Sequence, residues 1–521
     1  MNLLKTLLDA YQISEDEYKF MTRPLTLDSL EDYHNFDNVD KAKDRILEAI
    51  LKKEKIMIYG DYDCDGITSV SILVKMFQKL NYDVGYYIPS RYKDGYGINT
   101  SMVDLIHNKG YKLIITVDNG VSQIDALKKA KELGIDVILT DHHEILNDLP
   151  VFYTIMHPAF KSQMKMPQCG AYVAFNLSRA VLGYTDEYLM SLAGLATISD
   201  LMPLVKANRD IVRLTIDALN KNHYRSFELL KNDDNEYDEK TLGFDIAPKI
   251  NAVGRIKVDN SPNKVVKYFV SNDDKEVNLL ADFINSVNAL RKNLSTSAVD
   301  SLDLDEFKDD KVIVARFDDL SEGLLGLVAA KITSTLKKPS LVLCKNKDGI
   351  LKGSARSLEG YDVAEAFKNS DDLLLVYGGH AKAGGCSLEE KNYVLFKERL
   401  NEFAKDKVFK DDEKEAIEVT LDDLNYENYE LIKSFSPFGE GFKEIYLSVP
   451  YSTNKISYVG KVGQHIKGPI NKFCSFIHFN ADKDLLNSET IELIGHLEKD
   501  NFKKFKYVTF KVEEIKNLVR R

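Results

Sequence analysis

The chain has 521 residues, of which 44% are hydrophobic and 29% are charged. This length and composition predict about three or four globular domains and exclude a disordered or fibrous protein. Lysine and arginine total 70 while aspartate and glutamate total 81, a formal net charge of −11, which excludes a protein that coats nucleic acid by charge alone but not a nucleic-acid enzyme with a locally basic channel.

The five cysteines lie far apart and include no CxxC pair. This spacing argues against a disulfide framework or a structural zinc site and favours a reducing compartment. The N-terminus turns acidic early, and no run reaches the roughly 18 apolar residues of a membrane span. We therefore expect a soluble cytoplasmic protein without a membrane partner.

The first half of the chain alternates apolar runs with amphipathic stretches. Residues 55–59, 113–117 and 136–140 predict buried strands, and residues 67–80 and 123–133 carry apolar side chains at helical spacing. Strands separated by helices indicate an α/β fold with a doubly wound parallel sheet, in which ligands bind beyond the carboxyl ends of the strands. An aspartate or an aspartate cluster follows each of the three strands.

The second half indicates three further regions. Helical spacing continues to about residue 305, a second α/β pattern with a glycine-rich turn at 378–385 follows, and short β-rich runs then predict a small barrel. The expected domains are an N-terminal helical segment, a parallel-sheet domain, a helical connector, a second α/β domain and a C-terminal β-barrel, at residues 1–45, 46–215, 216–305, 306–405 and 406–521.

The segment from Gly60 to Gly66 places three aspartates, Asp61, Asp63 and Asp65, at alternate positions between a strand and a helix. Crowded carboxylates cost free energy unless cations neutralise them. Further acids and histidines follow the next two strands or lie in an apolar segment: Asp118, Asp141, His142, His143 and Asp200. Oxygen ligands with one or two imidazoles suit Mg²⁺ or Mn²⁺, and two such ions would stabilise the attacking and leaving oxygens of a phosphoryl displacement.

Two plainer interpretations compete with a metal site. The aspartates resemble the start of a calcium loop, but the glutamate that completes such a loop is missing at the required spacing. Asp61 or Asp141 alone would suit the N-cap of a helix. The convergence of four acid-bearing segments on one sheet edge favours the metal site.

These motifs resemble those of a known family. GDYDCDG, VDNG and DHH, in this order after successive strands, resemble the DHH phosphoesterase superfamily, and the rest of the chain is similar to its RecJ branch of single-strand-specific 5′→3′ exonucleases. The similarity runs from about residue 40 to 470 and includes residues 88–91 with 95–97, 247–255, 353–357 and 378–385. It implies a DHH domain, a helical linker, a DHHA1 domain and an OB-like barrel.

The resemblance also implies roles for individual residues. Two divalent cations, Mn²⁺ or Mg²⁺, would be held by Asp63, Asp65, Asp118, His142 and Asp200. Asp118 would bridge the two ions and act in catalysis, and Asp61 and His143 would support the site through hydrogen bonds or by contact with the scissile phosphate. The implied reaction is in-line attack of hydroxide on a phosphodiester, which releases a 5′-mononucleotide.

Binding of a 5′ end requires groups that recognise phosphate. Guanidinium groups and hydroxyls suit this role, and the resemblance implies it for Arg91, Arg255, Ser354 and Arg356. An isolated arginine is more often part of a surface salt bridge. The glycine-rich segment around His380 predicts a loop through which this imidazole and backbone amides approach the substrate.

The barrel and several departures from the family pattern bear on the substrate channel. Phe473 and Phe476 are available for stacking on single-stranded bases, although aromatic residues of such barrels are more often core. Leu320 and Ser321 stand where the family usually has a Trp-His pair, and Phe442 stands where it usually has asparagine.

We expect a metal-dependent 5′→3′ exonuclease on single-stranded DNA in repair or recombination, with a helicase and a single-strand-binding protein as candidate partners. One rival function is a related phosphoesterase that cleaves short oligonucleotides or dinucleotides; those relatives lack the 247–255 motif and the barrel. The other rival is a non-catalytic scaffold, which the complete set of acidic positions disfavours.

Overall fold

The computed structural model describes residues 2–145, 152–160, 166–257, 261–346, 349–410, 414–481, 488–500 and 506–517. The chain forms two compact units, each with its own hydrophobic core. The larger unit comprises Thr26–Pro203 and Ala207–Asp412, and the smaller one comprises Met1–Leu25, Leu204–Lys206 and Glu413–Arg521. Within the described ranges, none of the helices combines the length and apolar character that crossing a bilayer requires.

The larger unit contains a five-stranded parallel sheet in the order β2-β1-β3-β4-β5. Its strands are β1 (Lys55–Tyr59), β2 (Gly85–Tyr87), β3 (Tyr111–Val117), β4 (Asp136–Thr140) and β5 (Thr154–Met156). The expected strands at 55–59 and 136–140 are confirmed, and 113–117 forms most of β3. The strand order reverses between β1 and β3, and such a reversal opens a ligand crevice at the carboxyl edge of a sheet.

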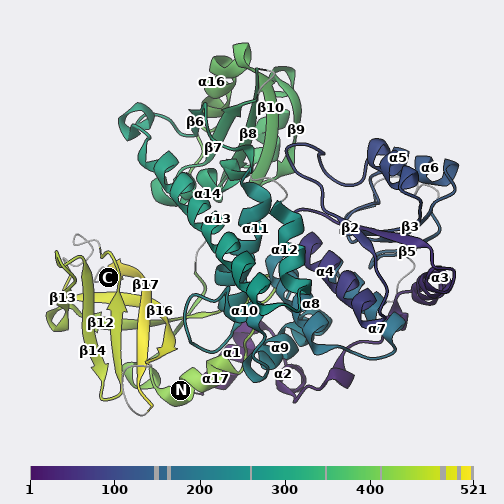
Figure 1. Cartoon of the computed structure of the whole chain (residues 1–521). Coiled ribbons are helices and arrows are strands. Elements are labelled where there is room, and N and C mark those ends of the chain that lie inside the picture. Colours follow the sequence, from purple (N-terminus) through teal and green to yellow (C-terminus); the bar gives the residue numbers. More distant parts are fainter. Residues whose placement is uncertain are drawn as a thin grey trace. The chain divides into compact units, whose positions relative to one another are not determined.

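Helices cover both faces of this sheet, as the doubly wound prediction requires. The helices of this region are α3 (Val39–Leu51), α4 (Cys64–Lys79), α5 (Thr100–Asn108), α6 (Ile124–Glu132), α7 (Gly170–Leu182), α8 (Glu187–Ser199) and α9 (Lys206–Lys221). Helices α5 and α6 pack on one face, and α4 and α7 contact the strands on the other (Figure 1). Helix α4 is nearly all buried, which fixes the aspartate loop at its N-terminus.

Helices make up the region expected to be a helical connector, although α9 runs across its expected start at residue 216. The region contains α10 (Arg225–Glu228), a π-helical segment η3 (Thr241–Ile246), α11 (Ala247–Arg255), α12 (Ser261–Val270) and α13 (Asp274–Asp300). Helix α11 packs against α13 and also touches α4 and α8 of the parallel-sheet domain. The 247–255 motif therefore lies on a helix directly beside the aspartate loop.

A second, mixed sheet follows in the same unit, in the order β6-β7-β8-β10-β9. Its elements are β6 (Ile313–Phe317), α14 (Leu325–Leu336), β7 (Ser340–Lys345), β8 (Ile350–Arg356), α15 (Val363–Lys368), β9 (Leu374–His380), β10 (Ala383–Glu389) and α16 (Tyr393–Phe403).

Only residues 381 and 382 of the glycine-rich segment 378–385 form a turn, so most of the segment is not the loop that the sequence predicted. It forms the facing ends of β9 and β10, which pair in an antiparallel hairpin. A Cβ on Gly379 would lie 2.4 Å from the Ala383 carbonyl oxygen, and one on Gly384 would lie 2.7 Å from Val363. The glycines permit this close packing, and composition alone does not distinguish it from a flexible turn.

The smaller unit joins the first 25 residues to the C-terminal β-rich region. Its elements are α1 (Leu3–Tyr11), α2 (Glu15–Thr22), β11 (Ala416–Glu418), α17 (Tyr426–Lys433), β12 (Tyr446–Ser452), β13 (Ser457–Val459), β14 (His465–Asn471), β15 (Cys474–His478), β16 (Thr490–Lys499) and β17 (Val508–Asn517). The strands form one sheet in the order β11-β12-β16-β17-β15-β14-β13.

The N-terminal segment differs from the expected boundary. Leu3, Leu7 and Leu8 of α1 belong to the hydrophobic core of the smaller unit, while α3 runs across the expected boundary at residues 45 and 46. Amphipathic spacing predicted these helices, but it carries no information about which distant core buries their apolar faces.

Candidate metal centre and substrate cleft

Neighbouring parallel strands bring acids to one edge of the sheet. Strands β1, β3 and β4 lie side by side, so Asp61, Asp118 and Asp141, which follow them, lie close together. Asp118 has a φ of +58°, in the left-handed region, and its N–H donates to the Thr140 carbonyl at 2.9 Å. A strained residue held by such a bond is typical of a functional site.

The loop before α4 orients two further carboxylates. Asp63 is the N-cap of α4, and its side chain accepts the Gly66 N–H at 3.1 Å. The carboxylate of Asp65 accepts the N–H of Gly170 at 2.6 Å and that of Ala171 at 2.7 Å. Both donors lie in the first turn of α7, where the helix dipole favours an anion.

Two glycines permit this crowding. A Cβ on Gly66 would lie 2.4 Å from the Asp61 carbonyl oxygen, and one on Gly170 would lie 2.7 Å from the Cβ of Asp118. The aspartate loop and the N-terminus of α7 therefore approach the carboxylates more closely than any larger residue would allow.

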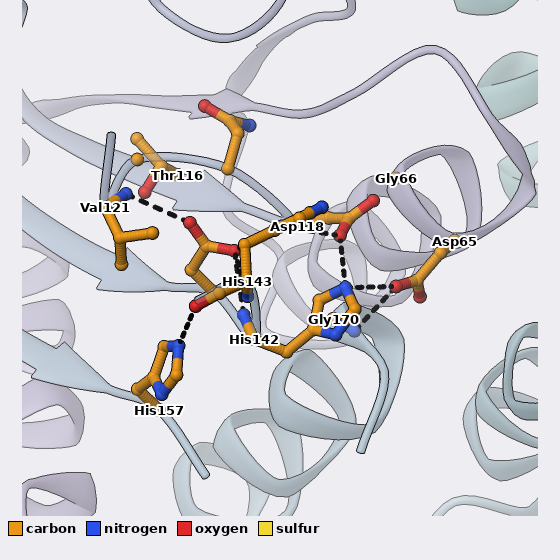
Figure 2. Close-up of polar contacts among 12 residues, drawn as sticks. Asp65, Gly66, Thr116, Asp118, Val121, His142, His143, His157 and Gly170 are labelled. Atoms are coloured by element: carbon orange, nitrogen blue, oxygen red, sulfur yellow. Dashed lines mark hydrogen bonds and ion pairs between the residues drawn. The ribbon is translucent and has the colours of Figure 1, made fainter. Parts of the chain in front are cut away.

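His142 lies at the centre of the cluster. Its Nε2 is 3.0 Å from Asp118 Oδ1, 3.5 Å from Asp65 Oδ2 and 3.6 Å from Asp200 Oδ2. Figure 2 shows the His142 ring between the side chains of Asp118 and Asp65. Asp200 reaches this position because it directly follows the C-terminus of α8.

Three overlapping groups of residues could each hold a cation. Within each group, the ligand atoms all lie within 4.8 Å of one another. The groups are Asp118 with His142 and His143, Asp65 with His142 and Asp200, and Asp61 with Asp63 and Asp118. Asp118 and His142 each belong to two groups. The structure thus brings together all seven acids and histidines that the sequence assigned to catalysis or metal binding.

Asp141 orients the two histidines. Its Oδ1 lies 2.8 Å from His143 Nδ1 and accepts the His142 N–H at 2.7 Å, while Oδ2 accepts the Val121 N–H at 3.0 Å. Burial opposes ionisation of Asp141, but the hydrogen bonds and charge of His143, together with the Val121 N–H, outweigh it and lower the Asp141 pKa. Burial also disfavours a charged His143, yet Asp141 raises the pKa of this histidine.

Asp61, Asp63, Asp118 and Asp200 are crowded and withdrawn from water, which opposes their ionisation. Burial and the neighbouring charge of Asp63 raise the pKa of Asp61 to about 7. Burial and the charge of Asp65 raise the pKa of Asp200 to about 8 and also raise the pKa values of Asp63 and Asp118. Asp61 Oδ1 and Asp200 Oδ2 are buried without a hydrogen-bond partner in the described part of the chain. Buried oxygens of this kind fit divalent cations that prefer carboxylate and imidazole ligands.

A cavity of about 220 Å³ joins the carboxylates to two of the predicted substrate-binding arginines. It is lined by Tyr62, Asp63, Asp65, Arg91, Ser199, Asp200, Asn251, Gly254 and Arg255. Burial and the nearby Arg91 and Arg291 lower the pKa of Arg255. The two guanidinium groups beside the acids suit a substrate whose phosphate oxygens accept hydrogen bonds from the arginines.

A second cavity, of about 480 Å³, lies against the mixed sheet and shares Arg91 with the first. Its lining includes Ser354, Lys352 and Glu322. Arg91, Arg255 and Ser354, three of the five predicted substrate residues, thus line the two cavities, and Arg356 Nη1 lies 3.2 Å from Ser354 Oγ. His380 is exposed at the end of β9 and is not among the residues that line them.

The sequence analysis does not assign a role to three residues that lie near the site. The Arg91 guanidinium lies 4.4 Å from the centre of the Tyr62 ring, Tyr96 Oη lies 3.2 Å from His143 Nε2, and Arg291 of α13 influences Arg255. Tyr62 and Tyr96 lie inside the motifs already singled out, so their position was a usable signal. Arg291 lies in an ordinary amphipathic helix, and only the packing of α13 on α11 reveals it.

Comparison with known proteins agrees with this geometry. Residues 55–199 match the DHH family N-terminal domain, residues 309–406 match the DHHA1 domain and residues 416–514 match the RecJ OB domain. The single-stranded-DNA-specific exonuclease RecJ of Haemophilus influenzae is 30% identical over 85% of this chain and 83% of its own length. The chain belongs to the RecJ family.

Other RecJ proteins extend the comparison. RecJ of Bacillus subtilis is 38% identical over 77% of this chain, which spans only about half of that relative, 52% of its length. The crystal structure of Thermus thermophilus RecJ in complex with Mn²⁺ superposes with a TM-score of 0.83 at 25% identity, over 99% of this chain and 78% of that one. The predicted fold class, a DHH domain with DHHA1 and OB-like domains, is confirmed.

Proposed function

We propose that this RecJ-family chain is a divalent-metal-dependent exonuclease that degrades single-stranded DNA from the 5′ end and releases 5′-mononucleotides. The observation that carries the proposal is the junction of a buried acid–histidine cluster with an arginine-lined cavity. Its relatives in Bacillus subtilis and Haemophilus influenzae are named single-stranded-DNA-specific exonucleases, which supports the substrate class.

Two Mn²⁺ or Mg²⁺ ions would be held by Asp63, Asp65, Asp118, His142 and Asp200. Structures of Thermus thermophilus RecJ in complex with Mn²⁺ and with Mg²⁺ support this choice. When bound, the ions supply positive charge to the attacking and leaving oxygens. Asp118 belongs to two of the three ligand groups, which supports its role as the bridge.

The chain's own groups orient the reaction. If His143 Nδ1–H donates to Asp141, the other ring nitrogen, Nε2, lies beside Tyr96. There Nε2 can face an incoming phosphate oxygen. Because Asp141 raises the pKa of His143, the imidazole can hold a proton and donate it there. Asp61 has a buried oxygen without a partner among the described residues, which suits a hydrogen bond to an attacking water.

Arg91, Arg255, Ser354 and Arg356 would hold the 5′-terminal phosphate and the nearby backbone, and His380 would contact the strand farther from the carboxylates. The proposal extends to repair or recombination in the cytoplasm, with a helicase and a single-strand-binding protein that supply or protect single strands.

The test compares oligonucleotides labelled at the 5′ or the 3′ end, single- or double-stranded, with Mn²⁺, Mg²⁺ or EDTA. We expect mononucleotide release from 5′ ends of single strands only, with no activity in EDTA or in Asp118→Ala. Asp217→Asn, which changes an exposed acid on α9, should retain full activity. Equal degradation from both ends, or unchanged activity in Asp118→Ala, would overturn the proposal. Activity confined to the shortest oligonucleotides would favour the rival phosphoesterase.

A further inference from the structure

Three segments that are distant in the sequence meet at the hydroxyl of Tyr92. Its Oη donates to the Arg255 carbonyl oxygen at 2.5 Å and lies 2.6 Å from the hydroxyl oxygen of Ser321. Ser321 Oγ is itself 3.4 Å from the Arg255 carbonyl oxygen. One phenol therefore links the parallel-sheet domain, the end of α11 and the turn that precedes α14.

The segments that meet at this junction are closely packed. A Cβ on Gly323 would lie 2.4 Å from the Arg255 carbonyl oxygen and 2.8 Å from Tyr92 Oη. Only glycine lets the turn approach α11 so closely, so the hydrogen bonds and the glycine together fix where the second domain meets the first.

The residues on either side of the junction are those proposed to hold the DNA end. Arg91 precedes Tyr92 and lines both cavities, while Arg255 lines the smaller one with Asp63. On the other side, the turn leads into α14, where a Cβ on Gly326 would lie 2.8 Å from Arg356 Nη2 and 3.1 Å from Ser354 Oγ. The junction thus connects the carboxylate cavity to the candidate 5′-phosphate site through short, rigid segments.

We infer that the Tyr92 hydroxyl, held by Arg255 and Ser321, is a positioning group that sets the distance between the 5′-phosphate site and the catalytic carboxylates. The inference rests on the proposed function. If the terminal phosphate is bound at Arg91 and Ser354, the phosphodiester that reaches the carboxylates is selected by this distance. A fixed distance selects one bond and hence a mononucleotide product, whereas a variable distance admits the next bond and weakens recognition of the terminal phosphate.

Ser321 stands where the related family usually has the histidine of a Trp-His pair. In this chain the Ser321 hydroxyl lies within hydrogen-bond distance of the Tyr92 hydroxyl. The contact therefore needs both hydroxyl groups. Loss of either hydroxyl should therefore act through the same junction.

The experiment compares Tyr92→Phe, Ser321→Ala and the double variant with the wild type. A matched control is Tyr268→Phe, because Tyr268 lies on α12, away from both cavities. Its hydroxyl donates to the Ser226 carbonyl oxygen at 2.7 Å. The readouts are product length on a 5′-labelled strand with Mn²⁺, and the ratio of Kd values for 5′-hydroxyl and 5′-phosphate oligonucleotides in EDTA, where no cleavage occurs.

We expect Tyr92→Phe to release dinucleotides as well as mononucleotides and to lower the Kd ratio by roughly three- to tenfold, the effect of one lost hydrogen bond. Ser321→Ala should act in the same direction, the double variant should match Tyr92→Phe, and Tyr268→Phe should keep both wild-type readouts.

Purely mononucleotide products and an unchanged Kd ratio in Tyr92→Phe would overturn the inference, even if its melting temperature fell, because the role would then be structural only. A Kd ratio near one in the wild type, with intact 5′ exonuclease activity, would also overturn it while leaving the proposed function in place. A wild type that cleaves no single strand would reject the proposed function itself.

Discussion

The carboxylate of Asp65 receives the backbone N–H of Gly170 at 2.6 Å, so a candidate metal ligand also fixes the first turn of α7. Asp118 lies against the same glycine but receives no such backbone bond from a described residue through its carboxylate. Two acids of one cluster therefore differ in what their removal should do to the fold.

Asp65→Asn and Asp118→Asn should both reduce nuclease activity to below about 1% of wild type, because each removes the charge of a proposed metal ligand. They should differ in stability. Asp65→Asn turns an acceptor of two N–H groups into an amide with a single acceptor oxygen, which should cost about 1.5–3 kcal/mol. Asp118→Asn removes a buried charge that its neighbours repel, so the metal-free protein should be as stable as wild type or more stable.

The measurement is thermal unfolding in EDTA and in saturating Mn²⁺. Wild type should gain stability with Mn²⁺, and Asp118→Asn should gain much less. A lower melting temperature for Asp118→Asn than for Asp65→Asn in EDTA would contradict the stated roles of the two carboxylates.

Gly254→Ala should impair catalysis through the position of α11. A Cβ at residue 254 would lie 2.2 Å from the Tyr62 carbonyl oxygen, so α11 would have to move away from the aspartate loop, and activity should fall by about tenfold or more. Gly134→Ala is the control, because Gly134 has a φ of +66° but open space around it. It should cost about 1 kcal/mol of stability with unchanged kcat. Similar kcat values for both variants would refute the argument.

Much of the site could be predicted from local sequence. Strands that end in acids predict the edge at which Asp61, Asp118 and Asp141 meet, because parallel strands align their carboxyl ends, and the structure confirms this edge. Motif resemblance alone predicts which residues act as metal ligands, whereas periodicity already predicts the order of the domains. No local pattern distinguishes Asp141, which orients histidines, from its neighbours in the cluster.

Other features depend on contacts between distant residues and were out of reach. Tyr92 and Ser321 are 229 positions apart, and no spacing rule pairs them. A glycine-rich composition predicts a flexible turn at residues 378–385. In the structure, glycines of this segment allow β9 and β10 to pack closely. Burial of α1 in the core of the C-terminal strands was likewise invisible locally.

Phe473 and Phe476 should separate DNA binding from stability in the smaller unit. Phe476 is 1% exposed and packs edge-on against Tyr451 at 4.9 Å, so it cannot be a stacking platform. Phe476→Ala should lower the free energy of unfolding by about 3–5 kcal/mol.

Phe473 is 47% exposed beside Lys472. Phe473→Ala should leave stability unchanged and weaken single-strand binding by about 1–3 kcal/mol. Fluorescence anisotropy with a long oligonucleotide and calorimetric unfolding test the pair, and equal DNA affinity of wild type and Phe473→Ala would exclude the stacking role.

Glu498 should make the smaller unit sensitive to acid. Its carboxylate lies 3.0 Å from His496 Nε2 and 3.2 Å from Lys511 Nζ, and the His496 hydrogen bond lowers the Glu498 pKa to about 2. An unfolded glutamate has a pKa of about 4.3, so the stabilisation is complete above that pH and is lost as the pH falls toward 2. Because the side chain is 44% exposed, Glu498→Gln should cost only about 0.5–1 kcal/mol at pH 7. The difference in unfolding free energy between variant and wild type should shrink at pH 4, and a difference that grows at pH 4 would reject this role.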